Sequence, residues 1–302
     1  MIDRTADRNL TFGIEIETVG KTRAHVAQAI ATALNGTVRN AGGTYDTVEV
    51  TMQDGRTWKV MRDGSLNCVH GGAEVVSPIC RYEDIELVQT VVRAVRECGA
   101  KVDASCGLHV HIGAKELGVA GVVNLAKMVA KNQDIIHHAL GIAARRLERW
   151  CKPVPTAFLE RLEEAKPTTF EALNVCWYGR SNPNPHHYDD TRYHGLNLHN
   201  VWFRKTVEFR WFEATLHAGE VKAYLQLCYA LAMAARAKRC TSAAARTFNA
   251  ETAKYDWRVV LLRLNLIGDE FATARLHLQK RLEGQSRTKR RTAATTTAEV
   301  AA

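Results

Sequence analysis

Charged and imidazole side chains occur two residues apart in several alternating stretches of the sequence. In residues 12–17, Glu15 and Glu17 alternate with apolar residues. In a strand, residues two apart point to the same face and lie roughly 6.5–7 Å apart, so these carboxylates would be neighbours. Two anions this close repel each other unless a cation or a proton lies between them. The spacing therefore fits either a solvated acidic strand face or a cation site.

Later stretches repeat this arrangement. His109 and His111 alternate with apolar residues, as do Glu208 and Arg210, while Glu74 is a single carboxylate in the apolar run 73–78. Each has an ordinary explanation, as a hydrogen-bonded core histidine, a surface ion pair or an exposed edge strand. If the strands share one sheet, however, one face is lined by carboxylates, imidazoles and a guanidinium. Such a face suits divalent cations bound mainly by oxygen.

A polar segment follows a predicted hairpin. Residues 47–52 and 57–61 alternate and are joined through Asp54-Gly55, which is a strong hairpin signal. The next residues then form either a second turn or a loop that presents Asp63 and Ser65 to a ligand. Spacing alone favours the turn.

The elements that must support these strands are predicted from apolar residues at helical spacing. They are helices over residues 21–34, 85–98, 115–150 and 219–239, with a final one around 257–264. Between them, residues 153–185 contain five of the six prolines, which indicates a long loop with one short helix around 157–165. The loop ends in the cluster His186 to Asp190, which fits substrate binding, although a solvated loop is the simpler interpretation.

Composition places the chain among ordinary globular proteins. Of its 302 residues, 46% are hydrophobic and 24% are charged. The eight cysteines are scattered without a C-x-x-C pair, which disfavours disulfide scaffolds and thiolate zinc sites. The N-terminus lacks an apolar signal core, and the longest apolar run, 223–235, is too short to cross a bilayer. We therefore expect a cytoplasmic protein without membrane contact.

Positive charge is concentrated near the C-terminus. Residues 275–291 contain seven Lys or Arg and one Glu, so +6 of the net +9 lies there. Such a segment attracts nucleic acid or is simply solvated, and the lack of interleaved aromatic residues favours solvation. Residues 284–302 are rich in Thr and Ala and are expected to be disordered.

Five motifs occur in an order that resembles a known family. They are F-G-I-E-I-E (12–17), D-G-S-L (63–66), E-V-V-S-P (74–78), G-L-H-V-H (107–111) and V-E-F-R (207–210). Together they resemble the amidoligases, carboxylate–amine ligases similar to glutamine synthetase and glutamate–cysteine ligase. The resemblance covers residues 10–235 and implies an α+β fold, an antiparallel sheet curved into a half-barrel and backed by helices. One catalytic domain, 1–283, would carry the poorly matching Pro-rich insert 153–194 and the tail 284–302.

The resemblance also implies cofactors and site residues. Such a ligase uses ATP with Mg²⁺ or Mn²⁺ to convert a small-molecule or peptide carboxylate into an acyl phosphate, which an amine attacks to give an amide, ADP and phosphate. The implied metal ligands are Glu15, Glu17, Glu74, His109, His111 and Glu208. Arg210 and Glu208 would be catalytic, Asp63 would orient a substrate, and Arg210 and Ser65 would contact ATP. Phage or mobile-element origin is also expected.

Two other functions fit parts of the same pattern. A zinc-dependent hydrolase could use His109 and His111 with a glutamate, although the sequence lacks H-E-x-x-H and this function leaves Arg210 unused. A non-catalytic protein could bind nucleic acid through the basic C-terminal segment, with binding that weakens in salt.

Overall fold

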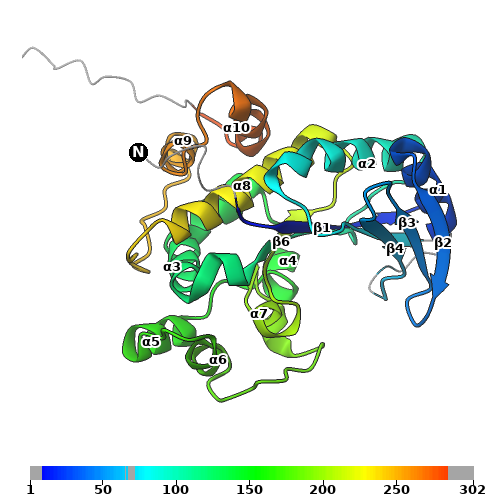
Figure 1. Ribbon diagram of the computed structural model, residues 1–302. Coiled ribbons are helices and arrows are strands. Elements are labelled where there is room, and N and C mark those ends of the chain that lie inside the picture. The colour runs from blue at the N-terminus through cyan, green and yellow to red at the C-terminus, as the bar shows by residue number, and fades with distance from the viewer. Residues whose placement is uncertain (1–8, 65, 67–71, 285–302) are drawn as a thin grey trace, which may run out of the picture.

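An antiparallel sheet organises the fold. The structure, a computed structural model, describes residues 9–64, 66 and 72–284. Within these residues, eight strands pair in the order β2-β3-β4-β5-β1-β6-β8-β7 and form an open sheet (Figure 1). The strands are β1 (Phe12–Val19), β2 (Thr37–Gly42), β3 (Thr47–Thr51), β4 (Thr57–Met61), β5 (Gly72–Val76), β6 (Gly107–Gly113), β7 (Leu196–Asn197) and β8 (Thr206–Glu213). The first strand therefore lies in the middle, between β5 and β6.

Helices cover both sides of this sheet. They are α1 (Arg23–Leu34), α2 (Ile85–Glu97), α3 (Ala114–Leu140), α4 (Ala144–Arg149), α5 (Thr156–Ala165), α6 (Phe170–Tyr178), α7 (His199–Phe203), α8 (Ala218–Arg236), α9 (Ala253–Arg263) and α10 (Ala272–Gln279). Figure 1 shows α2 and α8 on one side of β1 and α4 to α7 on the other. Helices α9 and α10 lie outside α3 and α8. The α+β architecture predicted from the sequence is confirmed, whereas curvature into a half-barrel and likeness to glutamine synthetase stay predictions.

Alternation in the strands determines which side of the sheet is apolar. In β1, Phe12, Ile14 and Ile16 are at most 3% exposed and belong to the same core cluster as buried residues of α2 and α8. The helix α2 packs there through a stripe that includes Val88 and Val92. Because side chains alternate along a strand, the charged residues between the apolar ones face the other side.

A β-bulge changes the alternation in β8. Leu108 of β6 lies opposite Phe212, and Val110 lies opposite Phe209, so β8 contains one extra residue in this interval. Strict alternation predicts that Trp211 continues the apolar row after Phe209. Instead Phe212 takes this position, with its ring stacked 4.1 Å from that of Tyr224 in α8.

Two elements differ from the predictions. The exposed edge strand β2 has no alternation of buried residues that could have indicated it. The Pro-rich segment contains α6 in addition to the predicted short helix, and the Thr169 side chain accepts the backbone N–H of Ala172 at its start. Pro155 and Pro167 precede α5 and α6 rather than interrupt them, a position that proline tolerates well.

The C-terminal helices belong to the folded part of the chain. The indole of Trp257 in α9 donates to the Leu278 carbonyl oxygen at 2.8 Å, and Lys280 Nζ lies 2.6 Å from Glu220 Oε1 in α8. The predicted basic segment is thus partly folded, up to residue 284. Residues 285–302, and with them the predicted disorder and nucleic-acid contact, lie outside the described residues. No described helix has the length and apolar character that a membrane span requires.

Candidate metal and catalytic site

The strand register brings the predicted residues onto one face of the sheet. Glu15 lies directly opposite His109, Glu17 opposite Glu74, and Glu208 opposite His111. Residues directly opposite each other in a sheet share a face. We call this face, which carries Glu15, Glu17, Glu74, His109, His111, Glu208 and Arg210, the polar face.

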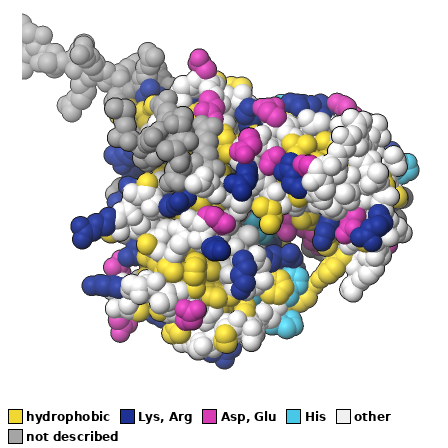
Figure 2. Space-filling view, viewed as in Figure 1, with side chains coloured by type: hydrophobic (Ala, Val, Ile, Leu, Met, Phe, Trp, Pro, Cys, Tyr) yellow, Lys and Arg dark blue, Asp and Glu magenta, His cyan; other side chains and the backbone are white. Residues whose placement is uncertain are grey.

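The polar face lies in a hollow of the molecular surface. It is the side of the sheet on which α4 and α7 lie (Figure 1). In Figure 2 a depression separates the part formed by β2 to β4 from the part below it, and acidic and histidine side chains gather along it. Most side chains of the polar face are buried, and Glu15 and Glu74 are the partly exposed ones.

Three side chains on the polar face form a histidine cluster, which we define as Glu15, His111 and Glu208. One potential ligand atom from each lies within 4.8 Å of the others. Nε2 of His111 is 3.4 Å from Glu15 Oε1 and 4.0 Å from Glu208 Oε1. His109 adjoins this cluster, because its Nδ1 is 3.3 Å from both Glu15 Oε2 and Glu208 Oε1.

The ring of His111 is oriented as a metal ligand would be. Its Nδ1 lies 2.9 Å from the hydroxyl of Thr206, whereas its buried Nε2 makes no hydrogen bond. A ligating histidine commonly donates its other N–H to such a partner, which fixes the tautomer and leaves a lone pair on the ligating nitrogen. A cation bound between Glu15 and Glu208 would satisfy this nitrogen, so the residues present fit a metal ion.

Glu208 is the most firmly held carboxylate of the site. Its Oε2 accepts hydrogen bonds from the side-chain amides of Asn197 and Asn200, each at 2.6 Å, and its Oε1 is 2.6 Å from Arg210 Nη1. Burial would raise the pKa of Glu208, but the positive charges of Arg210 and His111 lower it to about 2. Glu208 is therefore ionised and fixed in position.

Glu15 is likewise kept ionised. Burial would raise its pKa, but the nearby imidazoles of His111 and His109 hold it well below the usual range. Burial would lower the pKa of His111, but the negative charges of Glu15 and Glu208 raise it. Anions and cations thus balance within the histidine cluster.

A second group, the carboxylate cluster, consists of Glu17, Asp63 and Glu74. Their potential ligand atoms also lie within 4.8 Å of one another. Burial raises the pKa of Glu17, and burial together with Glu15, Asp63 and Glu17 raises that of Glu74 well above its usual value. Carboxylates this close together favour a proton or a cation between them. Because all the donors are oxygen atoms, the cluster fits Mg²⁺ or Mn²⁺.

Gly107 lies where β6 approaches the carboxylate cluster closely. The Gly107 backbone N–H donates to Glu17 Oε2 at 2.6 Å. A Cβ at this position would lie 3.1 Å from His109 Nε2 and 3.5 Å from Glu17 Oε2. A larger residue would therefore crowd the His109 ring, whereas its distance to Glu17 would be an ordinary van der Waals contact.

The structure thus brings together all the predicted site residues that it describes. Asp63, which the sequence analysis assigned to substrate orientation, lies among the candidate metal ligands, and Ser65 lies outside the described residues. Sequence reasoning missed Asn197 in β7 and Asn200 in α7, two short elements that no alternating or helical pattern marks.

Sequence reasoning also missed Arg146 in α4. Its buried guanidinium donates from Nη2 to the carbonyl oxygens of Arg210 and Phe212 at 3.0 and 3.1 Å. These carbonyls belong to the bulged part of β8, so Arg146 supports the backbone that carries Arg210. Nothing in its helical surroundings distinguished it from a surface arginine.

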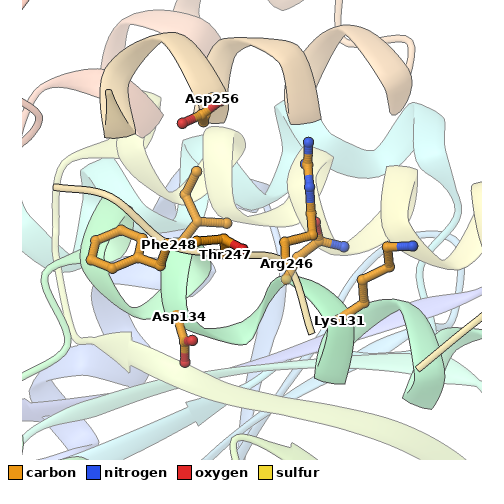
Figure 3. A pocket seen from close by; sticks show the side chains of 8 residues that line it. Lys131, Asp134, Arg246, Thr247, Phe248 and Asp256 are labelled. Atoms are coloured by element: carbon orange, nitrogen blue, oxygen red, sulfur yellow. The ribbon is translucent and has the colours of Figure 1, made fainter. Parts of the chain in front are cut away.

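A small pocket lies elsewhere and contains none of these residues. It has a volume of about 40 Å³ and is lined by α3, α9 and the segment before α9, including Lys131, Arg246, Phe248 and Asp256 (Figure 3). It lacks the converging ligand atoms of the polar face. The polar face is therefore the better candidate for chemistry.

Comparison with known proteins identifies the family. The family model described as "Putative amidoligase enzyme" matches residues 8–232, a range that includes both clusters and Arg210. No curated protein matches the chain. The match covers most of the chain and agrees with the five motifs found in the sequence. The chain therefore belongs to the amidoligase family.

Proposed function

We propose that the protein is an ATP-dependent ligase that joins a carboxylate to an amine. The observation that carries this proposal is the pair of clusters on one sheet face, with Arg210 beside them. Family membership supports a ligase-type enzyme. In the proposed reaction the carboxylate attacks the γ-phosphate of ATP and gives an acyl phosphate and ADP. The amine then attacks the acyl carbon, forms the amide and displaces phosphate.

Each cluster would hold a divalent cation. The carboxylate cluster supplies three oxygen donors, which suit Mg²⁺ or Mn²⁺, and the histidine cluster adds one imidazole nitrogen, which suits Mn²⁺ better than Mg²⁺. When bound, such ions neutralise phosphate oxygens during phosphoryl transfer. His109, which contacts Glu15 and Glu208, would orient these two carboxylates.

Arg210 has the position of a charge-stabilising residue. Its guanidinium is buried and held by Glu208, while its Nε makes no hydrogen bond within the described chain. This N–H is therefore available to an oxygen of the transferring phosphoryl group, where a fixed cation lowers the energy of the transition state. The predicted ATP contact of Ser65 and the glutamine synthetase-like half-barrel form part of the same proposal.

The proposal is tested by measuring ADP. Purified protein with Mg²⁺, ATP and pools of acids and amines should release ADP only when both an acid and an amine are present. Glu15→Gln should abolish this release, whereas Arg263→Ala, a change on the exposed side of α9, should not. ADP release at the wild-type rate in Glu15→Gln would contradict the assigned site.

One observation keeps a second function in consideration. The imidazole of His111 and the carboxylates of Glu15 and Glu208 are also donors that zinc accepts. A zinc hydrolase would cleave amides without ATP and would not need Arg210. Amide hydrolysis that continues in ATP-free buffer and in Arg210→Ala would favour it over the ligase.

A further inference from the structure

A group of ring and guanidinium side chains borders the polar face near β7 and α7. We call it the arginine wall and define it as His187, Tyr188, Arg192, Phe203 and Arg204. The first three belong to the end of the Pro-rich segment, where the sequence indicated either substrate binding or a solvated loop. The neighbouring residues Asn197 and Asn200 hold Glu208, so the wall continues directly from the site.

The rings of the wall form an ordered but exposed surface. The imidazole of His187 is stacked on Phe203 with ring centres 4.8 Å apart and planes 9° apart, and Tyr188 lies 4.5 Å from His187. Tyr188 is nevertheless 61% exposed and Phe203 38%. Exposed aromatic rings gathered beside a candidate active site are characteristic of a surface that receives a ligand.

The two arginines are positioned without being neutralised. Arg192 donates from Nη1 to the His187 carbonyl oxygen at 3.1 Å, and its guanidinium lies 5.5 Å from the ring centre of Tyr188. The guanidinium of Arg204 lies 5.6 Å from the ring centre of Phe203. Such contacts orient a cation but leave its charge in place. In the described part of the chain, neither arginine forms an ion pair with a carboxylate.

The charges of the wall act on the polar face. Arg204 interacts electrostatically with Glu74 and with His111 of the polar face. Burial and the two arginines lower the pKa of His187 to about 4, so this ring is neutral at pH 7. The wall therefore offers two cations and a flat uncharged surface.

The segment that carries the wall reaches across the hollow. Hydrogen bonding between Tyr188 and Tyr45 raises the pKa of Tyr45, which precedes β3 on the opposite part of the sheet. His187 interacts electrostatically with Glu15 of the histidine cluster. A molecule bound on the polar face would thus lie between the acidic clusters and the arginine wall.

We propose that Arg192 and Arg204 bind an anionic oxygen group, a carboxylate or a phosphate, of the molecule that occupies this space. The inference deepens the proposed function and rests on it for the identity of that molecule. The carboxylate cluster repels anions until a cation occupies it, so cations at another point help to hold an anionic substrate. Arginine supplies paired N–H donors that match the oxygens of a carboxylate or a phosphate.

Inorganic phosphate is the first probe. Its affinity is measured by calorimetry in EDTA, so that the clusters cannot bind it through a metal ion. The double variant Arg192→Ala/Arg204→Ala should bind phosphate roughly ten- to a hundredfold more weakly than wild type, as expected when charged hydrogen bonds are lost. Arg263→Ala, which removes another exposed arginine, should match wild type. Equal affinity in the double variant, or no saturable binding by wild type, overturns the proposal.

Two further probes identify the source of the anionic group. If the double variant binds the β,γ-imido analogue of ATP with Mn²⁺ at least tenfold more weakly, the wall contacts nucleotide phosphate. If analogue binding is unchanged and succinate displaces phosphate from wild type, the wall contacts the acid substrate. Either result supports the anion site.

Metal binding separates this inference from the proposed function. Mn²⁺ binding, followed by electron paramagnetic resonance, should be equal in wild type and in the double variant. Loss of Mn²⁺ binding in the double variant would mean that the substitutions disturb the clusters, and the anion site would then be rejected. If ADP formation is never found while phosphate binding still depends on the arginines, the ligase proposal fails and the anion site stands.

Discussion

The histidine cluster and the carboxylate cluster lie on the same sheet face but differ in how their charge is balanced. Around Glu208, Arg210 and His111 supply positive charge, and two amides complete the hydrogen bonds. Around Glu74, burial and neighbouring carboxylates act in the same direction and raise its pKa well above the usual value. One cluster is therefore balanced by the protein itself, whereas the other is balanced only by a bound proton or cation.

This difference teaches which part of the site the protein forms in advance. A balanced cluster keeps its geometry with or without metal and can hold a reacting group in place. Repulsion among the like charges of the carboxylate cluster destabilises the folded protein, and a bound cation removes this repulsion. Metal binding should consequently stabilise the carboxylate cluster more than the histidine cluster.

The largest effect is expected when the balance of the histidine cluster is broken. Arg210→Ala leaves Glu208 buried beside the histidines without its nearest cation, and breaking a buried pair typically costs about 3–5 kcal/mol of unfolding free energy. ADP formation should fall by roughly 10³-fold or more if Arg210 stabilises the transferring phosphoryl group. Urea unfolding and an ADP assay measure the two effects. Arg210→Lys is the matched control, and it should recover stability more than activity.

Replacing one glutamate of each cluster by glutamine should change the unfolding free energy in opposite directions. In EDTA, Glu15→Gln should lower the unfolding free energy by about 1–3 kcal/mol, because it removes the partner of both histidines. Glu74→Gln should leave it unchanged or raise it, because it removes a repelled charge. Both variants should bind Mn²⁺ about tenfold more weakly or worse. Destabilisation of the same size in both variants would show that the clusters do not differ as described.

The pH dependence of stability should also separate the clusters. In the folded state the pKa of Glu74 is raised above its ordinary value of 4.5. Glu74 therefore destabilises the protein increasingly as pH rises from 4.5 through this raised pKa. Glu208, with a pKa of about 2, contributes stability above pH 4.5 that is lost as pH falls toward 2. In EDTA, the melting temperature of wild type should therefore fall relative to Glu74→Gln above pH 4.5, and saturating Mg²⁺ should remove the difference. Parallel pH profiles would contradict the assignment.

The smallest effect is expected from the amides that hold Glu208. Asn200→Ala removes one hydrogen bond to a charged group, which is worth about 1.5–3 kcal/mol, although Asn197 still donates to the same oxygen. Unfolding free energy should fall by no more than this amount, and ADP formation by a few-fold. Asn132→Ala, at an amide that donates to a carbonyl within α3, is the control and should leave activity unchanged. A loss of activity as large as that of Arg210→Ala would mean that Asn200 contacts the substrate.

Much of the site could be predicted because alternation in a strand determines the face on which each side chain lies. This rule placed Glu15 with Glu17, and His109 with His111, before their neighbours were known. It could not predict register, so the pairing of Glu17 with Glu74 and the entry of Asp63 into their cluster required the structure. The roles of Asn197, Asn200 and Arg146 depend on a bulge and on a helix distant in sequence. Contacts of this kind cannot be predicted from the local sequence pattern.

The family match ends at residue 232, within α8, whereas α10, which packs on α8, comes later in the chain. Ala274 and Leu278 of α10 are at most 1% exposed, and Lys280 meets the nearly buried Glu220. A fragment trimmed to the matched residues would cut this helix before its last turn and uncover apolar surface, with aggregation as the expected result. The end of the family match is therefore not a point at which the polypeptide can be divided.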